Sequence, residues 1–310
     1  MNMIDIVIAV YNPNKYLNEQ IDSILSQTFV HKVARIIMID DNSKDDRYIK
    51  ENLNKDSRIE WHKNQTNRNG ASANFSAGIE LTTAEYVMTC DQDDVWLSNK
   101  IEISYTEIES LKSRNAKGAP LLIATDVKVV DENLGIIENS FFEYRKTNLP
   151  TDTLIESLLF KNIVPGCTMM FNRALVDLAI PVSVEAMMHD WWLLLVAKLD
   201  GEVSILPVQT MLYRQHSNNC LGAQKRSPLS ALKRRSLTKN FALAELHINN
   251  VMKQAGALLS QHKMSEDYNY LVQRIINFDS INRFHKIYFI LRYFKTDVYK
   301  KVSYLLVSLF

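Results

Sequence analysis

Short apolar runs alternate with amphipathic segments through the first 220 residues of the chain. Residues 4–10, 34–39 and 86–90 are β-rich apolar runs without a polar face, which is typical of strands buried on both sides of a sheet. Apolar positions at helical spacing predict helices over residues 17–27, 45–53 and 71–81, and residues 59–62 predict another short strand. Because strands and helices alternate, we predict an α/β fold with a mostly parallel sheet and helices on both faces.

The alternation continues to about residue 220 and then stops. The pattern predicts a long helix over 98–114, strands over 121–130, 167–172 and 209–214, and helices over 152–159, 173–180 and 189–199. Beyond residue 221 the apolar positions follow continuous helical periodicity in a segment rich in Lys, Arg, Tyr and Phe. We therefore predict an α/β domain over residues 1–220 and a helical C-terminal appendage over residues 221–310.

Composition and charge limit the classes of function. A chain of 310 residues, 46% hydrophobic and 23% charged, is an ordinary globular chain with room for one large domain and an appendage. The formal net charge of +1 provides no strong field for nucleic acid, so we expect no nucleic acid partner. Residues 221–310 hold about fifteen Lys and Arg against five Asp and Glu. The first 220 residues are correspondingly acidic and are expected to carry the chemistry.

The cysteines and the N-terminus predict a reducing compartment. Cys90, Cys167 and Cys220 are far apart and odd in number, which argues against both a disulfide framework and a zinc knuckle. The first apolar run contains Asp5 and follows no basic segment, so it predicts a buried strand and not a signal peptide. We therefore expect a cytoplasmic protein.

Polar residues follow three of the predicted strands, at Tyr11, at Asp40-Asp41 and at residues 91–94. In open α/β sheets ligands bind beyond the carboxyl ends of the strands, so these segments are expected to meet in one crevice. Residues 91–94 hold three carboxylates within four positions, which repel one another unless a cation such as Mg²⁺ or Mn²⁺ lies among them. The simpler alternatives are an acidic turn in which Asp94 caps the next helix, and a turn with an N-cap at Asp40 and Asp41.

Several motifs occur together in the order and spacing of one family. They are VYN at residues 10–12, IDDNS at 39–43, NG at 69–70 followed by Asn74, DQDDVW at 91–96 and HDWW at 189–192. With these motifs the chain resembles the inverting family 2 glycosyltransferases, which have a GT-A fold. GCT at 166–168 and YRQH at 213–216 make it most similar to the bacterial rhamnosyltransferase-like branch. The resemblance covers roughly residues 3–219.

The resemblance implies roles for individual residues. In similar enzymes the loop after the first strand and the second aspartate of the Asp-Asp pair hold the nucleotide, and the first two residues of the acidic run lie near the donor sugar. Asp93 would be the direct ligand of a divalent metal, Mg²⁺ or Mn²⁺. The residues expected to bind the nucleotide sugar are Ala9, Tyr11, Asp41, Asn74, Asp91, Gln92 and Arg214.

Two further predictions concern catalysis and the metal shell. An inverting transfer needs one base that takes the proton of the acceptor hydroxyl, and in the family the aspartate at the position of Asp190 has this task. The tryptophans Trp96, Trp191 and Trp192 are expected on the acceptor side, where flat rings stack on sugars. His216 is expected to complete the metal shell, and Arg214 to offset the charge of the diphosphate. The alternatives are a helix N-terminal role for Asp190, a core role for the tryptophans and a solvated His216.

The basic, aromatic stretch over residues 281–310 has two interpretations. Its apolar segments are shorter than the about 18–20 residues that span a bilayer. Basic and aromatic residues at helical spacing fit a helix on the inner face of the cytoplasmic membrane, beside a lipid-linked acceptor. They fit equally a helical cap on the first domain or on a second subunit of a homo-oligomer.

The sequence therefore predicts a metal-dependent, inverting glycosyltransferase of bacterial cell-envelope polysaccharide biosynthesis. It would move a single sugar from a nucleoside diphosphate sugar to a hydroxyl of a surface polysaccharide or lipid-linked glycan. The resemblance points to dTDP-rhamnose as the donor and leaves UDP-hexoses open. A nucleotidyltransferase is the enzymatic alternative, but residues 11–15 lack the glycines of a phosphate loop. A non-catalytic scaffold is the other alternative, against which the presence of both Asp93 and Asp190 argues.

Overall fold

The computed structural model describes residues 3–216 and 237–280, together with residues 282, 284, 286–288 and 291. The contacts divide the chain into two compact units. The first consists of Met1–Asn148, Val164–Val182 and Met188–Gly222, and the second of Leu149–Ile163, Ser183–Met187 and Ala223–Phe310. The second unit thus includes two short segments that lie within the first 220 residues of the sequence.

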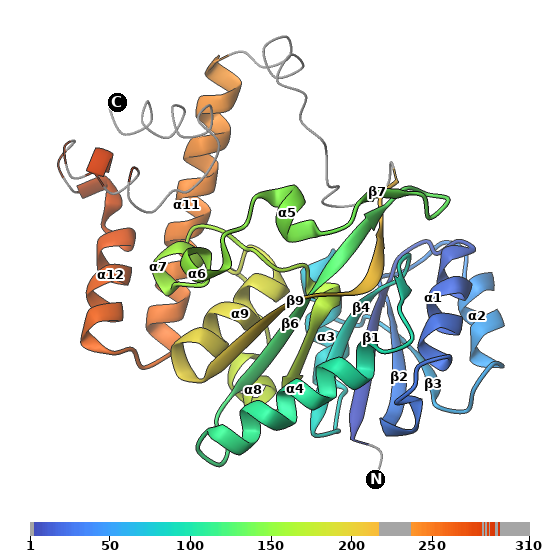
Figure 1. Cartoon of the computed structure of the whole chain (residues 1–310). Coiled ribbons are helices and arrows are strands. Elements are labelled where there is room, and N and C mark those ends of the chain that lie inside the picture. Colours follow the sequence, from blue (N-terminus) through green and yellow to red (C-terminus); the bar gives the residue numbers. More distant parts are fainter. Residues whose placement is uncertain are drawn as a thin grey trace. The chain divides into compact units, whose positions relative to one another are not determined.

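Within the described residues, nine strands form a single sheet in the first unit (Figure 1). Their order is β3-β2-β1-β4-β8-β6-β9-β5, and β7 pairs with β6. The strands are β1 (Ile4–Val10), β2 (Val33–Asp40), β3 (Ile59–Lys63), β4 (Tyr86–Asp91), β5 (Val95–Trp96), β6 (Leu121–Val130), β7 (Ile136–Glu138), β8 (Met169–Asn172) and β9 (Glu202–Arg214).

The sheet is parallel in its first half and mixed in its second. Strands β3, β2, β1 and β4 run parallel, as the sequence pattern predicts. Strand β8 lies antiparallel between β4 and β6, β9 is parallel to β6, and the two-residue β5 is antiparallel to β9. The α/β class is therefore confirmed, with an antiparallel component that the sequence does not reveal.

Helices cover both faces of the sheet (Figure 1). In the first unit they are α1 (Tyr16–Leu25), α2 (Arg47–Leu53), α3 (Ala71–Glu80), α4 (Lys100–Arg114), α5 (Phe141–Arg145), α8 (Arg173–Ala179) and α9 (His189–Asp200), with 3-10 turns η1 (Val30–Lys32) and η2 (Gly166–Thr168). Ile6 of β1 packs in one core cluster with Leu17 of α1 and Ile101 of α4. Val7 points to the other face, where a Cβ added to Gly78 of α3 would lie 2.5 Å from its Cγ1. Both faces of β1 are thus buried, which explains its unbroken apolar sequence.

The elements that the structure describes in the second unit are helices. They are α6 (Leu149–Asp152), α7 (Ile155–Leu158), α11 (Leu237–Gln261), α12 (Glu266–Ile276) and the 3-10 turn η3 (Phe278–Ser280). The sequence predicts one helix over 152–159, but Leu154 is extended at ψ 141° and separates two short helices. α11 and α12 form a hairpin whose buried residues recur at helical spacing: Ile248, Val251, Ala255 and Leu258 on α11, and Leu271, Val272 and Ile275 on α12.

The basic, aromatic stretch over residues 281–310 lies mostly outside the described residues, so its predicted contact with a membrane or a second subunit is not tested. Among the helices that the structure describes, none is both long enough and apolar enough to cross a membrane.

Candidate functional site

The strand register brings the predicted polar segments to one edge of the sheet. Val10 of β1 pairs with Asp40 of β2, and Ala9 of β1 pairs with Asp91 of β4. Because these strands are parallel, the residues that follow them leave the sheet at the same edge. This is the edge at which open α/β sheets bind ligands.

A side-chain amide joins the loops that follow β1 and β4. Gln92 Oε1 accepts a hydrogen bond from the Tyr11 N–H at 3.0 Å, and Gln92 Nε2 donates to the Tyr11 carbonyl at 3.1 Å. The Tyr11 side chain itself is 56% exposed. Gln92 thus fixes the backbone beside Ala9 and leaves the tyrosine ring open to solvent.

The two aspartates at the end of β2, one in the strand and one after it, have different contacts. Asp40 is buried and accepts hydrogen bonds from the N–H and the hydroxyl of Ser43, so it forms the turn. Asp41 Oδ2 accepts from the N–H of Gly70 at 2.8 Å, while its Oδ1 is buried without a hydrogen-bond partner in the described part of the chain. Gly70 has φ 92°, a conformation that favours glycine at the start of α3. Asp41 therefore has an acceptor free for a ligand.

The Asn74 side chain forms hydrogen bonds to the ends of both β1 and β2. It is 2% exposed, and its Nδ2 donates to the carbonyl of Ile39 at 2.8 Å and to that of Val10 at 3.4 Å. Asn74 Oδ1 is a second buried acceptor without a partner among the described residues. The amide nitrogen of Asn74 therefore helps to position the loops that follow β1 and β2.

The three carboxylates of the acidic loop, residues 91–94, lie in different environments. Burial, followed by the charges of Asp93 and Asp190, raises the pKa of Asp91 to about 7. Asp94 is fully buried, and burial together with the charges of Asp93 and Asp91 raises its pKa well above the usual range. Asp94 Oδ1 accepts from the N–H of Arg214 at 2.9 Å, so Asp94 does not cap the following helix. Burial, together with the charges of neighbouring aspartates, therefore disfavours the ionised forms of Asp91 and Asp94 in this loop.

The short strand β5 brings His216 to this loop. Val95 pairs with Leu212 of β9, so the end of β9 lies beside the acidic loop that precedes β5. There His216 Nε2 and Asp93 Oδ2 are 2.7 Å apart, and the imidazole stacks on the ring of Tyr16 with centroids 5.7 Å apart. The two residues expected to ligate a metal are 123 positions apart in the sequence and in direct contact in the fold.

The Arg214 side chain is buried and forms its contacts within the protein. Its side chain is 2% exposed, and its guanidinium donates to Glu19 Oε2 at 2.5 Å, to the Asp93 carbonyl at 2.8 Å and to the Glu132 carbonyl at 2.6 Å. The guanidinium also lies 4.1 Å from the centroid of the Tyr16 ring. These contacts make Arg214 a buried support of the acidic loop, so the structure does not favour the expected contact with a diphosphate.

Two groups of side chains have donor atoms that suit a cation. Carboxylate oxygens of Asp91 and Asp94 and the Sγ of Cys167 lie within 4.8 Å of one another, but Asp94 and Cys167 are fully buried. Asp93 and His216 are more open, with side chains 20% and 13% exposed. A carboxylate and an imidazole suit Mn²⁺, whereas a thiol does not suit Mg²⁺. The residues present therefore fit a divalent metal, with the Asp93–His216 pair as the accessible part.

Asp190 lies in the first turn of α9, close enough to Asp91 for its charge to raise the pKa of that group. It is 7% exposed, and its Oδ1 accepts from the N–H of Trp191 at 2.6 Å. A Cβ added to Gly166 would lie 3.1 Å from the Asp190 Cβ and 2.7 Å from His189 Nε2. Glycine at position 166 thus allows the start of α9 to approach the acidic loop.

His189 and Lys100 are features of the site to which the sequence analysis gave no role. His189 is buried, stacks on Phe75 with centroids 4.0 Å apart, and has no hydrogen-bond partner for either ring nitrogen in the described part of the chain. Burial lowers its pKa to about 3, so the ring is neutral. Lys100 is fully buried beneath the loop, where burial lowers its pKa to about 8. The sequence signals that could have revealed these two residues are a histidine directly before Asp190 and a lysine six positions after Asp94.

The predicted acceptor-side tryptophans are core residues in this structure. Trp96 is 3% exposed, Trp191 5% and Trp192 0%, and Trp192 Nε1 donates to the Ala179 carbonyl at 3.0 Å. Lys100 Nζ lies 5.1 Å from the centroid of the Trp96 ring. Rings with so little free surface do not offer a stacking platform to a sugar, so we do not assign them an acceptor role.

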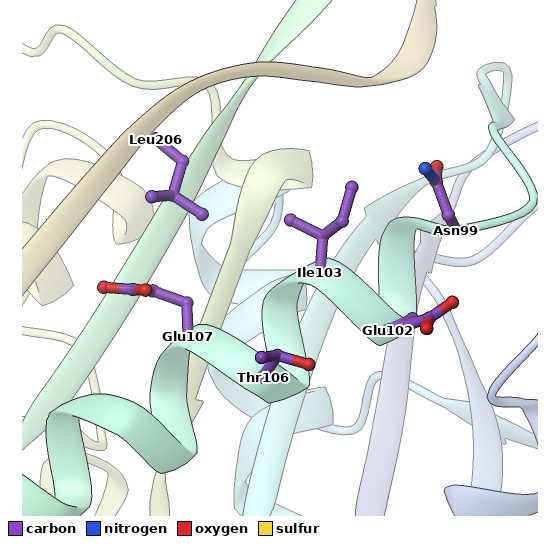
Figure 2. Close-up of a pocket in the computed structure, with 6 residues that line it drawn as sticks. All are labelled: Asn99, Glu102, Ile103, Thr106, Glu107 and Leu206. Atoms are coloured by element: carbon purple, nitrogen blue, oxygen red, sulfur yellow. The ribbon is translucent and has the colours of Figure 1, made fainter.

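A hollow elsewhere on the first unit lacks comparable chemistry (Figure 2). It measures about 480 Å³ and lies between α4 and β9, lined by Asn99, Glu102, Ile103, Thr106, Glu107 and Leu206. Its carboxylates already accept hydrogen bonds, Glu102 from Thr28 and Glu107 from Ser204. The strand-end edge, where the pKa values of Asp91 and Asp94 are raised, remains the better candidate for the active site.

Comparisons with known proteins agree with this geometry. Residues 5–178, more than half of the chain, match the family model described as Glycosyl transferase family 2. The chain is 33% identical over 139 residues to an uncharacterized glycosyltransferase of Methanocaldococcus jannaschii, covering 44% of this chain and 45% of that protein. It is 35% identical over 113 residues to the Escherichia coli UDP-Glc:alpha-D-GlcNAc-diphosphoundecaprenol beta-1,3-glucosyltransferase WfaP, covering 36% of this chain and 44% of WfaP. The matches thus span less than half the length of these curated relatives.

The solved structures agree on the fold. The mannosyltransferase PcManGT of Pyrobaculum calidifontis, in complex with GDP-Man and Mn²⁺, superposes with a TM-score of 0.57 at 12% identity. The superposition covers 99% of this chain and 73% of PcManGT. Similarity at this level of identity concerns the fold alone, and it confirms the GT-A architecture expected from the sequence.

Proposed function

The chain belongs to glycosyl transferase family 2, and from this premise we propose that it transfers one sugar from a nucleoside diphosphate sugar to a hydroxyl of a glycan acceptor. The observation that carries the proposal is the meeting of Asp93, His216 and the pKa-shifted Asp91 at one edge of the sheet, next to Asp190. Perturbed carboxylates at a ligand-binding edge are typical of active sites.

The donor nucleotide would bind at the loops that follow β1 and β2. Asp41 Oδ1 and Asn74 Oδ1 are buried acceptors without partners in the described residues, and an N–H group of a base can satisfy such an atom. The exposed Tyr11 ring and the Gln92-fixed backbone beside Ala9 lie next to these loops. Donor specificity would then arise from the Asp41 carboxylate, the Asn74 amide and backbone groups around the base.

A divalent cation would be held by Asp93 and His216, with Asp91 nearby. When bound, such an ion supplies Lewis-acid stabilisation of the leaving diphosphate. The pKa of Asp91, raised first by burial and then by the charge of Asp93, supports this proposal, because a cation would offset the repulsion between these two groups. The Mn²⁺ in the PcManGT complex supports it by analogy of fold.

Asp190 would act as the base in a direct displacement. The acceptor hydroxyl loses its proton to the Asp190 carboxylate as its oxygen forms a bond to the anomeric carbon. The bond from that carbon to the diphosphate oxygen breaks at the same time, so the configuration inverts and no covalent enzyme intermediate forms. Its place in the first turn of α9 puts the Asp190 carboxylate near the positive end of the helix dipole.

The relatives suggest the class of acceptor. WfaP is by name a UDP-glucose transferase acting on a sugar linked to diphosphoundecaprenol. We therefore propose a lipid-linked glycan as acceptor and a cytoplasmic enzyme that meets it at the membrane surface. UDP-glucose, suggested by WfaP, and dTDP-rhamnose, suggested by the rhamnosyltransferase-like motifs, are the donors to distinguish.

The experiment is a binding and transfer panel with UDP, dTDP and GDP sugars, each with and without Mn²⁺. We expect one nucleotide class to bind in a metal-dependent manner, and Asp93→Ala to weaken that binding. Asp190→Asn should retain donor binding and lose about 10²–10⁴ in transfer rate, the range attributed to a general base. Asp177→Asn, an exposed aspartate on α8, is the matched control. A wild-type transfer rate in Asp190→Asn contradicts the assignment of the base.

A further inference from the structure

One side of α12 in the second unit carries an unusual group of residues. Ser265 caps the helix through a hydrogen bond from the Tyr268 N–H. Asp267, Tyr270, Leu271 and Arg274 follow at the spacing i, i+3, i+4 and i+7, so they share one face. Leu271 is buried, whereas the Tyr270 side chain is 65% exposed.

This face forms one wall of a hollow of about 330 Å³ within the second unit. Glu156 of α7 and Tyr288 complete the lining, with Asp267, Tyr268, Tyr270, Leu271 and Arg274 from α12. Tyr288 is 53% exposed. The size falls within the range of about 300–1,000 Å³ that is usual for small-ligand sites.

Arg274 holds the Tyr270 ring in place. Its guanidinium lies 5.7 Å from the ring centroid, and its Nη1 donates to the Tyr270 hydroxyl at 3.3 Å. An exposed tyrosine held in this way offers a rigid flat face to a ligand at little entropic cost.

The lining indicates the chemistry of the ligand. Three tyrosines supply apolar faces and hydroxyls, two carboxylates accept hydrogen bonds, and one guanidinium donates them. The C–H faces of a sugar ring pack on aromatic rings, and its hydroxyls bond to carboxylate and guanidinium groups. The carboxylates outnumber the guanidinium, so the local charge disfavours phosphate groups and an anionic membrane surface. A neutral, hydroxyl-rich ligand fits best.

We propose that this hollow is a carbohydrate-binding subsite that holds a neutral sugar unit of the acceptor glycan. That the glycan is the acceptor rests on the transferase activity proposed above, whereas the binding of carbohydrate does not. The subsite consists of residues of the second unit, whereas the proposed base Asp190 belongs to the first. Binding there would contribute to the selection of acceptors.

The test is binding of the full-length protein to an array of defined oligosaccharides from bacterial surface polysaccharides and lipid-linked glycans. We expect at least one oligosaccharide to bind, and Tyr270→Ala and Tyr288→Ala each to weaken its affinity about tenfold, which is the size of effect expected for an aromatic contact at the centre of a site. Phe284→Ala is the matched control, because Phe284 is 85% exposed and does not line the hollow. The melting temperature of each variant should stay at the wild-type value, since Tyr270 and Tyr288 are largely exposed.

Two results would overturn the subsite. One is that no oligosaccharide binds the wild type more tightly than it binds Tyr270→Ala. The other is that Tyr270→Ala loses binding to phosphatidylglycerol vesicles while no glycan binds, which would assign the hollow to lipid. Asp190→Asn should bind the array as the wild type does. If transfer fails with every donor but glycan binding still depends on Tyr270, the transferase proposal fails and the carbohydrate subsite stands.

Discussion

Arg214 offers the sharpest test of how the acidic loop is held. The sequence suggests a free guanidinium that offsets the charge of a diphosphate, whereas the structure places it in a buried network with Glu19, Asp93 and Glu132. The informative change is Arg214→Met, because methionine retains an unbranched apolar stem and removes every donor. We expect this variant to lose stability and not merely donor affinity.

The magnitude follows from the lost contacts. A hydrogen bond to a charged group contributes about 1.5–3 kcal/mol, and the bond from Arg214 to the Asp93 carbonyl is buried enough to count in full. Glu19 is 40% exposed at its side chain, so water replaces most of that ion pair and its contribution is small. With the Glu132 bond counted at its lower limit, the loss is about 3–4.5 kcal/mol. At about 2–4 °C per kcal/mol, this lowers the melting temperature by roughly 6–18 °C.

The assay is thermal and urea unfolding followed by tryptophan fluorescence, in parallel with donor titration. Arg47→Met is the matched control, since the Arg47 side chain is 81% exposed and pairs only with its neighbour Asp45 among the described residues. Its unfolding midpoint should equal that of the wild type. If Arg214→Met unfolds at the wild-type midpoint while donor binding collapses, the guanidinium binds the donor directly and the structural argument is refuted.

Three further predictions concern the same edge of the sheet. The pKa of Asp91 is about 7 in the folded protein against an ordinary value of 3.8, so the wild type should lose stability as the pH rises from about 4 to 7. Asp91→Asn should remove this loss. A difference in melting temperature between the two proteins that does not change with pH would contradict the prediction. Gly166→Ala places a methyl group 2.7 Å from His189 Nε2, so it should lower the stability by about 1–3 kcal/mol and also lower the transfer rate. Gly256→Ala places its methyl group in open space and should lower neither the stability nor the transfer rate. Mn²⁺ should raise the wild-type melting temperature more at about pH 8 than at about pH 5.5, because carboxylates bind metal when ionised. If Mn²⁺ raised the melting temperature of Asp93→Ala as much as that of the wild type, Asp93 would be excluded as a ligand.

The strands with buried faces were predictable from the sequence. β1, β2, β4 and β6 match the predicted runs to within one residue at either end, because burial on both faces leaves an uninterrupted apolar signal. Even Asp5 does not break this pattern, since the fully buried carboxylate is paired with Arg35 at 2.7 Å. The two-residue β5 and the three-residue β7 were not predicted, because segments of that length carry no period.

The backbone of the site was more predictable than its side chains. The sequence placed the polar loops at one edge because parallel strands end there. It did not reveal that Trp192 is in the core. The apolar pair Trp191-Trp192 at the start of a helix has the same local sequence pattern whether or not other parts of the chain pack over it. The same holds for Arg214, whose partners Glu19 and Glu132 are distant in sequence. Side-chain burial depends on tertiary neighbours that no local pattern encodes.

The strand that the sequence missed is the one that assembles the site. Asp93 and His216 are 123 positions apart in the sequence, and the pairing of β5 with β9 is what brings them into contact. The antiparallel pairing explains why the acidic run continues directly into Val95 and Trp96: their backbone groups bond to β9, and this fixes the loop beside the end of that strand. The Trp96 ring, buried over Lys100, then anchors the short strand in the core. The tryptophan of the DQDDVW motif is thus a buried support of the short strand that follows the acidic loop.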